Sequence, residues 1–153
     1  MRRVGALGVL IATVAACGGG GGELTRVEYV RRANAVCRDA AQAVEDLRVP
    51  RTADGDALVS ASAAVVQIQR RALERLRELS APTADRAALT RWLALVDQTL
   101  DQSDASVRAQ RSGDVQAALT ANANGEVLDR QADELARRYG LTSCVQAGSV
   151  PTP

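Results

Sequence analysis

Carboxylates are the side chains of this sequence whose spacing could support cation binding or acid–base chemistry. Two sets of three acidic residues recur at intervals of three and four: Asp97, Asp101 and Asp104, then Glu126, Asp129 and Asp133. On two helices these intervals would place each set in one row. Facing rows would offer oxygen ligands to a hard cation such as Ca²⁺. The simpler interpretation, which we prefer, is two solvated acidic faces that hold no metal and no cofactor.

The residue types that are missing exclude most other chemistry. The 153 residues contain no His and no Lys, and all 19 basic residues are Arg. Without His there is no Ser-His-Asp or Cys-His catalysis, and without Lys there is no Schiff base or P-loop. Aromatic residues make up 2% of the chain, so a glycosidase carboxylate pair would lack its usual sugar platforms. A formal net charge of +1 argues against nucleic acid, which needs a concentrated basic face.

The N-terminal segment has the features of a secretion signal. Met1-Arg2-Arg3 is basic and is followed by thirteen uncharged residues, fewer than the roughly 20 that span a bilayer. The segment ends in Val14-Ala15-Ala16-Cys17, which resembles the lipobox of bacterial lipoproteins. That resemblance implies cleavage after Ala16 and a diacylglycerol thioether, with fatty acids such as palmitate, on Cys17. The alternative is an ordinary secretory signal that leaves Cys17 as a free thiol.

The composition divides the chain into four parts. Residues 1–16 form the expected signal peptide, and residues 17–23 the lipidated Cys and a tether of five consecutive glycines, which is flexible. Residues 24–144 form a helical domain. Residues 145–153, which include Pro151 and Pro153, are expected to be a disordered tail.

Local signals predict where the helices of the domain begin and end. Thr25-Arg26-Val27-Glu28 matches a capping box and starts the first helix, which Val49-Pro50 ends. Ser80-Ala81-Pro82 ends the second helix. Ser112-Gly113 separates the third helix from the fourth, for which Asp114 is a good N-cap. Tyr139-Gly140-Leu141 predicts a glycine C-cap followed by an apolar contact residue.

Apolar residues recur at intervals of three and four within each of these segments, which predicts amphipathic helices. Their similar lengths and short links indicate an all-α, up-down-up-down four-helix bundle. The expected core stripes are Val30, Ala33, Cys37, Ala40, Val44 and Leu47; Leu58, Ala61, Val65, Ile68, Ala72, Leu76 and Leu79; Leu89, Trp92 or Leu93, Val96, Leu100, Ser103 and Val107; and Val115, Leu119, Leu128, Ala132, Leu135 and Tyr139.

Two features of these helices stand out from the pattern. Asn122, Asn124 and Gly125 disfavour a helix interior, so they indicate a kink, a polar contact or a crossing at small residues. Trp92, the only tryptophan, is expected in the core or at its rim rather than as a platform for a ligand.

Cysteine usage predicts one disulfide. With Cys17 assigned to the anchor, Cys37 and Cys144 remain as a pair in an oxidising compartment. Cys37 lies about 18 Å along the first helix, whereas the four residues after Gly140 reach about 13 Å, so the chain must fold back. A longer fourth helix or an axial offset would close the gap. The alternative is two free thiols.

Two motifs around these cysteines resemble those of small helical lipoproteins from high-G+C, actinobacterial-type bacteria. They are Asn34-Ala35-Val36-Cys37 and Tyr139-Gly140-Leu141-Thr142-Ser143-Cys144. Such proteins carry an Ala- and Asn-rich run into the first Cys and end in Gly-Leu-x-x-Cys. The resemblance covers residues 24–144 and implies an anchor, a helical fold and a disulfide, but no active site.

Three functions from different classes are compatible with these observations. The first, which we prefer, is a non-catalytic interaction module, held by its lipid on the extracytoplasmic face of the cell membrane, that binds an envelope protein. The second is a carrier or sensor for a small apolar ligand inside the bundle, and the third is an enzyme that uses carboxylates and a cation. An exposed apolar patch would favour the first, an internal cavity the second, and converging buried carboxylates the third.

Overall fold

The computed structural model describes residues 22–48 and 54–146, and these residues form helices and no strands. The elements are α1 (Arg26–Glu45), α2 (Gly55–Arg77), a short 3₁₀ turn η1 (Thr83–Asp85), α3 (Arg86–Ser112), α4 (Val115–Tyr139) and α5 (Thr142–Gln146). The signal peptide and Cys17 lie outside the described residues, as do Val49-Pro50, residues 147–153 and all of the tether but Gly22 and Glu23. None of the described helices is long and apolar enough to cross a membrane.

Short-range hydrogen bonds set the helix boundaries. Thr25 caps α1 in a capping box, because its side chain accepts from the Glu28 amide while the Glu28 carboxylate accepts from the Thr25 amide. Asp114 caps α4 by accepting from the Ala117 amide at 2.9 Å. Gly113 ends α3 and Gly140 ends α4, each with a left-handed backbone (φ of 74° and 92°) that glycine adopts without strain. The capping box, the Asp114 cap and the Gly140 cap confirm the sequence predictions.

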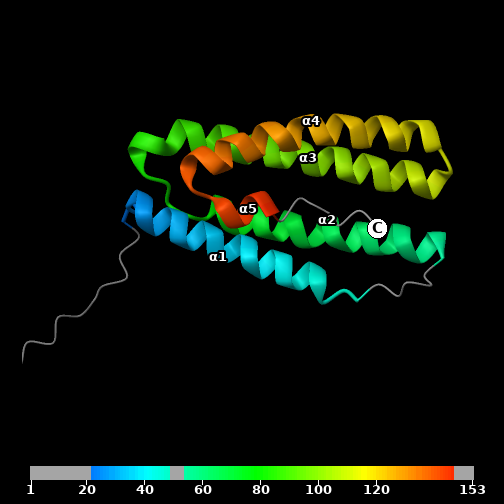
Figure 1. Ribbon diagram of the computed structural model, residues 1–153, viewed down its shortest axis with the longest axis horizontal. Helices are drawn as coiled ribbons and strands as arrows, with labels where there is room; N and C mark the ends of the chain where they lie inside the picture. Colours follow the sequence, from blue (N-terminus) through cyan, green and yellow to red (C-terminus); the bar gives the residue numbers. More distant parts are fainter. Residues whose placement is uncertain (1–21, 49–53, 147–153) are drawn as a thin grey trace, which may run out of the picture.

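The four long helices form the expected up-down-up-down bundle (Figure 1). Consecutive helices pack against each other, and the α3–α4 pair has the most extensive interface. The unpredicted helix α5 packs on both α1 and α4, so it fills part of the space between the first and last helices of the bundle. It also includes Val145 and Gln146, two residues that the sequence had assigned to a disordered tail.

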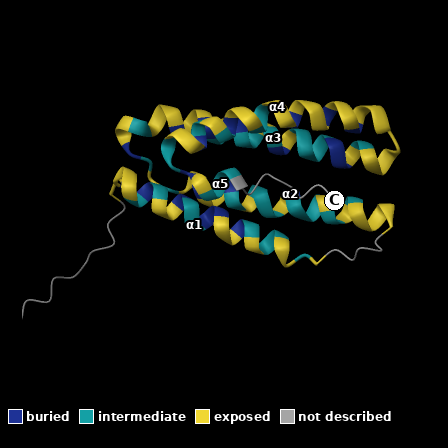
Figure 2. Cartoon of the chain, viewed as in Figure 1, coloured by how far each residue is buried: buried dark blue, intermediate teal, exposed yellow. Residues whose placement is uncertain are grey.

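The main hydrophobic core lies at one end of the bundle, which we call the basal end. Leu24 enters the domain there, with its amide bonded to the Ser80 carbonyl at 3.2 Å. The core cluster combines residues from every long helix and from the segment after α4: Leu24, Tyr29, Ala33, Val36, Cys37, Leu76, Leu89, Trp92, Leu95, Ala132, Ala136 and Leu141. Figure 2 shows the contrast with α4 near its link to α3, where the outer surface is exposed. We call this opposite end the tip.

Each predicted core stripe is wrong in part, and those of α2 and α4 differ most from the buried residues. On α2 the buried residues are Val66, Leu73 and Leu76, which places the core-facing side about one residue away from the Val65–Ala72 stripe. On α4 the buried residues near the tip are Ala118, Ala121 and Gly125, whereas Val115 and Leu119 are 68% and 58% exposed. Small side chains let two helix axes approach closely, so the tip half of α4 packs through alanine and glycine.

The Asn-Gly segment of α4 is a crossing at small residues. A Cβ atom built on Gly125 would lie 3.4 Å from the Cβ of Gln102 on α3. Asn122 and Asn124 are exposed and do not interrupt the helix. Of the three interpretations that the sequence allowed, the small-residue crossing is therefore the one observed.

Candidate functional site

The acidic residues of α3 converge on one arginine of α2. Arg70 donates from Nε to the Asp104 carboxylate at 2.9 Å and from Nη2 to the Asp101 carboxylate at 2.7 Å. A longer contact of 3.4 Å joins its Nη1 to Asp97. The Arg70 and Asp104 side chains are 28% and 27% exposed, so the pair is only partly hydrated. Bonds to Asp101 and Asp104 raise the pKa of the Arg70 guanidinium above its ordinary value.

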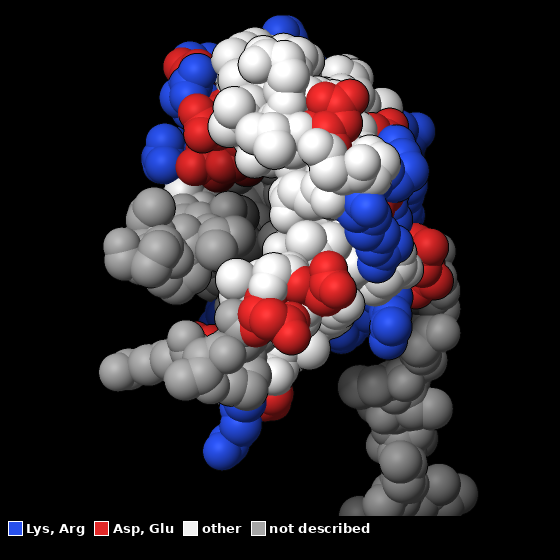
Figure 3. Space-filling view, turned by 90° about the vertical axis from the view of Figure 1, so that its right-hand side faces the viewer, with Lys and Arg blue, Asp and Glu red and all other residues white. Residues whose placement is uncertain are grey.

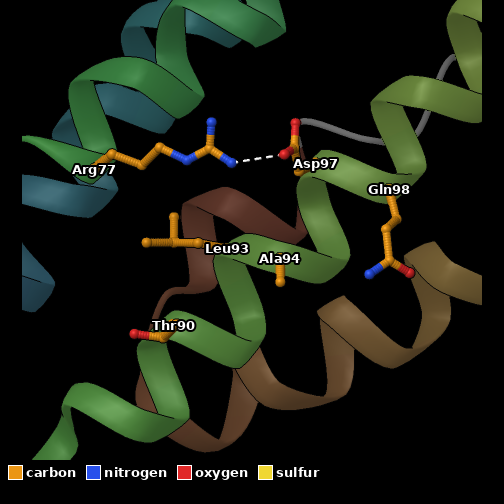
Figure 4. Close-up of a pocket in the computed structure, with 6 residues that line it drawn as sticks. All are labelled: Arg77, Thr90, Leu93, Ala94, Asp97 and Gln98. Carbon is orange, nitrogen blue, oxygen red and sulfur yellow. Dashed lines mark hydrogen bonds and ion pairs between the residues drawn. The ribbon is translucent and has the colours of Figure 1, made fainter.

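A second arginine of α2 extends this cluster along the bundle. Arg77 lies two turns after Arg70 and donates to the other oxygen of Asp97 at 2.7 Å. Beside this pair is an open hollow of about 400 Å³ on the surface of α2 and α3, shown in Figure 4, lined by Arg77, Thr90, Leu93, Ala94, Asp97 and Gln98. Its two charged groups, Arg77 and Asp97, already neutralise each other across the interface, so the hollow presents no uncompensated charge to a ligand.

Glu126 and Asp133 of the acidic row on α4 pair within their own helix. Glu126, whose side chain is 74% exposed, lies 3.9 Å from Arg130, and Asp133 accepts from Arg137 at 3.0 Å. Burial raises the pKa of Asp129, although nearby Arg130 and Arg137 oppose that effect. Burial also raises the pKa of Asp133, with a further contribution from the charge of Asp129.

The two acidic rows do not face each other, which corrects the cation-site hypothesis. The two rows lie at similar levels along the bundle, because Gln102, next to Asp101, lies opposite Gly125. Their orientation differs: Asp97, Asp101 and Asp104 point to α2, where arginine neutralises them. Among the described residues, no group of three or more His, Cys, Asp or Glu side chains is arranged to hold a metal ion. The row on α3 is therefore an ion-pair cluster that joins two helices.

The predicted Cys37–Cys144 disulfide is present, with a Cα–Cα distance of 5.0 Å that is normal for such bonds. The fourth helix is not longer than predicted, since α4 ends at Tyr139, but Gly140 already lies beside Val30 and Asn34, part of the way along α1. The chain reverses at Gly140, buries Leu141 completely and continues as α5, which runs beside α1. Asn34 fixes this reversal: its Nδ2 donates to the Gly140 carbonyl at 3.0 Å, and its Oδ1 accepts from the Ser143 amide at 2.9 Å.

A smaller hollow of about 260 Å³ opens at the basal end between α1, α3 and α4. We call it the basal hollow. It is lined by Arg26, Asp85, Ala88, Leu89, Trp92, Leu135, Arg138, Tyr139 and Leu141. Trp92 is 3% exposed and belongs to the core cluster, as predicted, but its ring also borders this hollow.

The tip half of α4 carries an uncharged exposed surface, although the apolar pattern predicted Val115 and Leu119 in the core. Residues 115–125 contain no charged side chain, although 24% of the whole chain is charged. We define the uncharged face of α4 as the exposed members of this segment: Val115, Gln116, Ala117, Leu119, Thr120, Asn122, Ala123 and Asn124. Viewed toward the tip in Figure 3, the upper part of the molecule is largely free of charge, and charged side chains gather on its flanks.

Two signals in the sequence point to these missed features. The run of eleven uncharged residues is visible in the sequence itself. Arg70 and Arg77 recur at an interval of seven, which places them on one face of α2, opposite in charge to the aspartate row of α3. No known protein family, curated protein or solved structure matches this chain.

Proposed function

We propose that this chain is a lipoprotein of the extracytoplasmic face of the cell membrane, anchored at Cys17, whose helical domain binds an envelope protein and catalyses no reaction. The lipobox Val14-Ala15-Ala16-Cys17 supports the anchor. The resemblance of the cysteine motifs to those of small actinobacterial-type lipoproteins supports it further.

The observation that carries the binding role is the uncharged face of α4. Val115 and Leu119 lie one turn apart and are 68% and 58% exposed, so they present apolar surface on the same side of the helix. The surrounding exposed residues are alanine, threonine, glutamine and asparagine, which lack the charges that most of this surface carries. Depletion of charge around exposed apolar side chains is characteristic of the centre of a protein–protein interface.

The position of this face suits a tethered binding protein. The chain enters the domain at Leu24, at the basal end, and α4 begins at the opposite end. Its 25 residues span about 37 Å. With the lipid on Cys17, the uncharged face would thus stand away from the membrane and remain accessible to a neighbouring protein.

The carboxylates favour binding over catalysis. Arg70 and Arg77 hold the aspartates of α3 in ion pairs between helices, which is a role in packing. Asp133 is paired to Arg137. Asp129 has a raised pKa, but the neighbouring acid whose pKa it raises, Asp133, is held in that ion pair, and acid–base catalysis needs a second group that is free to exchange a proton or to attack.

Site-specific cross-linking in whole cells tests the binding role. A photoreactive benzoylphenylalanine at position 119 should capture one discrete protein species, and the same group at the exposed Val27 of the basal end should not. Adding Val115→Asp to the variant with the photoreactive group at position 119 should remove that species. A charge at the centre of an apolar contact loses its hydration on binding, which is unfavourable. Equal capture at both positions, or capture that survives Val115→Asp, would contradict the proposal.

The anchor has its own experiment. Cells grown with a labelled fatty acid should incorporate label into the wild-type chain and none into Cys17→Ala. Cys37→Ala, which keeps the lipobox, is the matched control and should remain labelled. Label on Cys17→Ala would show that the lipobox interpretation is wrong.

A further inference from the structure

The basal hollow combines an apolar floor with charged groups at its rim. The floor consists of Leu89, Trp92 and Leu141, which are 2%, 3% and 0% exposed, together with Leu135. Arg26, Asp85, Arg138 and Tyr139 stand at the rim. An apolar floor with a few polar groups at one edge is the usual construction of a site for a small amphiphilic ligand.

The charges at this rim differ in whether they are already neutralised. Asp85 accepts a hydrogen bond from the Tyr139 hydroxyl at 2.8 Å, and Arg138 forms an ion pair with Glu134 within α4. Arg26 lies over the Tyr139 ring, 4.4 Å from its centroid, and makes no ion pair with any carboxylate of the described residues. The ring face holds this guanidinium by a cation–π contact and leaves its N–H donors available.

We propose that the basal hollow binds an anionic amphiphile, with a carboxylate or phosphate at Arg26 and an apolar chain against Trp92 and Leu135. A guanidinium is well suited to such anions, because its fork of N–H donors matches two oxygens. The volume of about 260 Å³ lies just below the roughly 300–1,000 Å³ of typical ligand pockets. The hollow therefore accommodates a short chain or one end of a longer one. This proposal goes beyond the protein-binding role and does not depend on it.

The single tryptophan of the chain makes the site observable. Because Trp92 lines the hollow, a bromine atom at the end of a bound chain should quench the fluorescence of the protein by contact. The full chain, reconstituted in phosphatidylcholine vesicles, would be titrated with ω-bromooctanoate. We expect saturable quenching by this anion and at least about tenfold weaker binding of the uncharged ω-bromooctanol, since a charge-assisted hydrogen bond is lost.

Two variants and one control assign the effect to the hollow. Arg26→Gln should weaken ω-bromooctanoate binding at least about tenfold, whereas Arg31→Gln, which removes an exposed arginine from the same helix, should not change it. Ala88→Leu should also abolish quenching, because Ala88 lines the hollow, and since it is exposed the larger side chain should leave the core intact.

A second arm identifies the source of the anion. Vesicles that contain brominated phosphatidylglycerol should quench Trp92 without added octanoate if the ligand is a membrane lipid, and should not if the ligand is a free carboxylate. Quenching by either anionic probe that Arg26→Gln and Ala88→Leu weaken supports the site. Absence of quenching by both probes, equal quenching by the alcohol, or quenching unchanged in both variants would overturn it.

Discussion

The side-chain amide of Asn34 donates a hydrogen bond to the carbonyl oxygen of Gly140 over 3.0 Å, although 106 residues separate them in sequence. The same side chain accepts from the Ser143 amide, so one residue of α1 satisfies a carbonyl and an N–H of the reversal that follows α4. Both contacts are partly buried, which makes their loss costly.

Replacing Asn34 should therefore destabilise the domain. Asn34→Ala leaves the Gly140 carbonyl and the Ser143 amide without their partner, so we expect the free energy of unfolding to fall by about 1–3 kcal/mol. Urea denaturation of the oxidised protein measures this loss. Asn122→Ala, at an exposed position of α4, is the control and should change stability by less than about 0.5 kcal/mol. Equal effects of the two variants would show that the Asn34 contacts do not stabilise the fold.

Gly125 should tolerate one added methyl group and reject a larger side chain. The Cβ of Gly125→Ala would meet the Gln102 Cβ at 3.4 Å, an ordinary contact, and alanine is the better helix former, so stability should rise by about 0.5–1 kcal/mol. Gly125→Leu should lower it by about 1–3 kcal/mol, because it overfills the crossing of α3 and α4. Thermal unfolding of the two variants against wild type measures both signs, and a stabilising Gly125→Leu would contradict the close crossing.

The Arg70 cluster should make a measurable, salt-dependent contribution to stability. Arg70→Met removes the cation that separates three carboxylates, and we expect a loss of about 1–2 kcal/mol, between the values for exposed and buried pairs. High salt should reduce the loss, because it screens the remaining repulsion. Arg75→Met breaks only an exposed pair with Asp39 and should cost less than about 0.5 kcal/mol. A loss that is the same at low and high salt would indicate packing of the arginine stem instead.

Asp129 should lower the stability of the fold at neutral pH. Its folded-state pKa is raised above the ordinary 3.8 by burial, so the folded protein holds this proton more tightly than the unfolded chain does. Stability is then lost as pH rises from the ordinary value through the raised one. Asp129→Asn should be more stable than wild type at neutral pH, and the gain should vanish below the ordinary pKa.

Denaturation midpoints measured across this pH range test that sign. Glu126→Gln removes the same charge from the same row at a side chain that is 74% exposed, so it serves as the control for a general change in net charge. If Asp129→Asn is less stable than wild type at neutral pH, the carboxylate makes a favourable interaction that outweighs its desolvation.

The features that the sequence predicted are those that depend on a few neighbouring residues. Each predicted cap satisfies backbone groups within one helical turn: the Thr25–Glu28 capping box, the Asp114 N-cap and the Gly140 C-cap. The pattern of residue types is therefore sufficient to place them. The cysteine pair followed from their number and from the expected compartment. These signals were sufficient to predict the four long helices and the Cys37–Cys144 disulfide, which links α1 to the segment after α4.

The errors concern how a helix is rotated toward its neighbours. Val115 and Leu119 are larger and more apolar than Ala118 and Ala121, so the hydrophobic pattern favoured them as core. The close crossing of α3 and α4 instead selects the small residues, and that preference depends on the partner helix. The rotation of α3 likewise turns Asp101 toward Arg70 rather than toward α4. Nothing within either helix alone specifies that choice.

The Cys37–Cys144 bond also determines how the domain would carry a mechanical load. A force pulling Leu24 away from Gln146 passes along α1 to Cys37, crosses the disulfide and leaves through α5. The 107-residue separation of the cysteines means that α2, α3 and α4 lie outside this covalent path. Tension between the two ends of the domain would therefore act through the backbone of the segments before Cys37 and after Cys144 alone, and the backbone of α2, α3 and α4 would carry none of it.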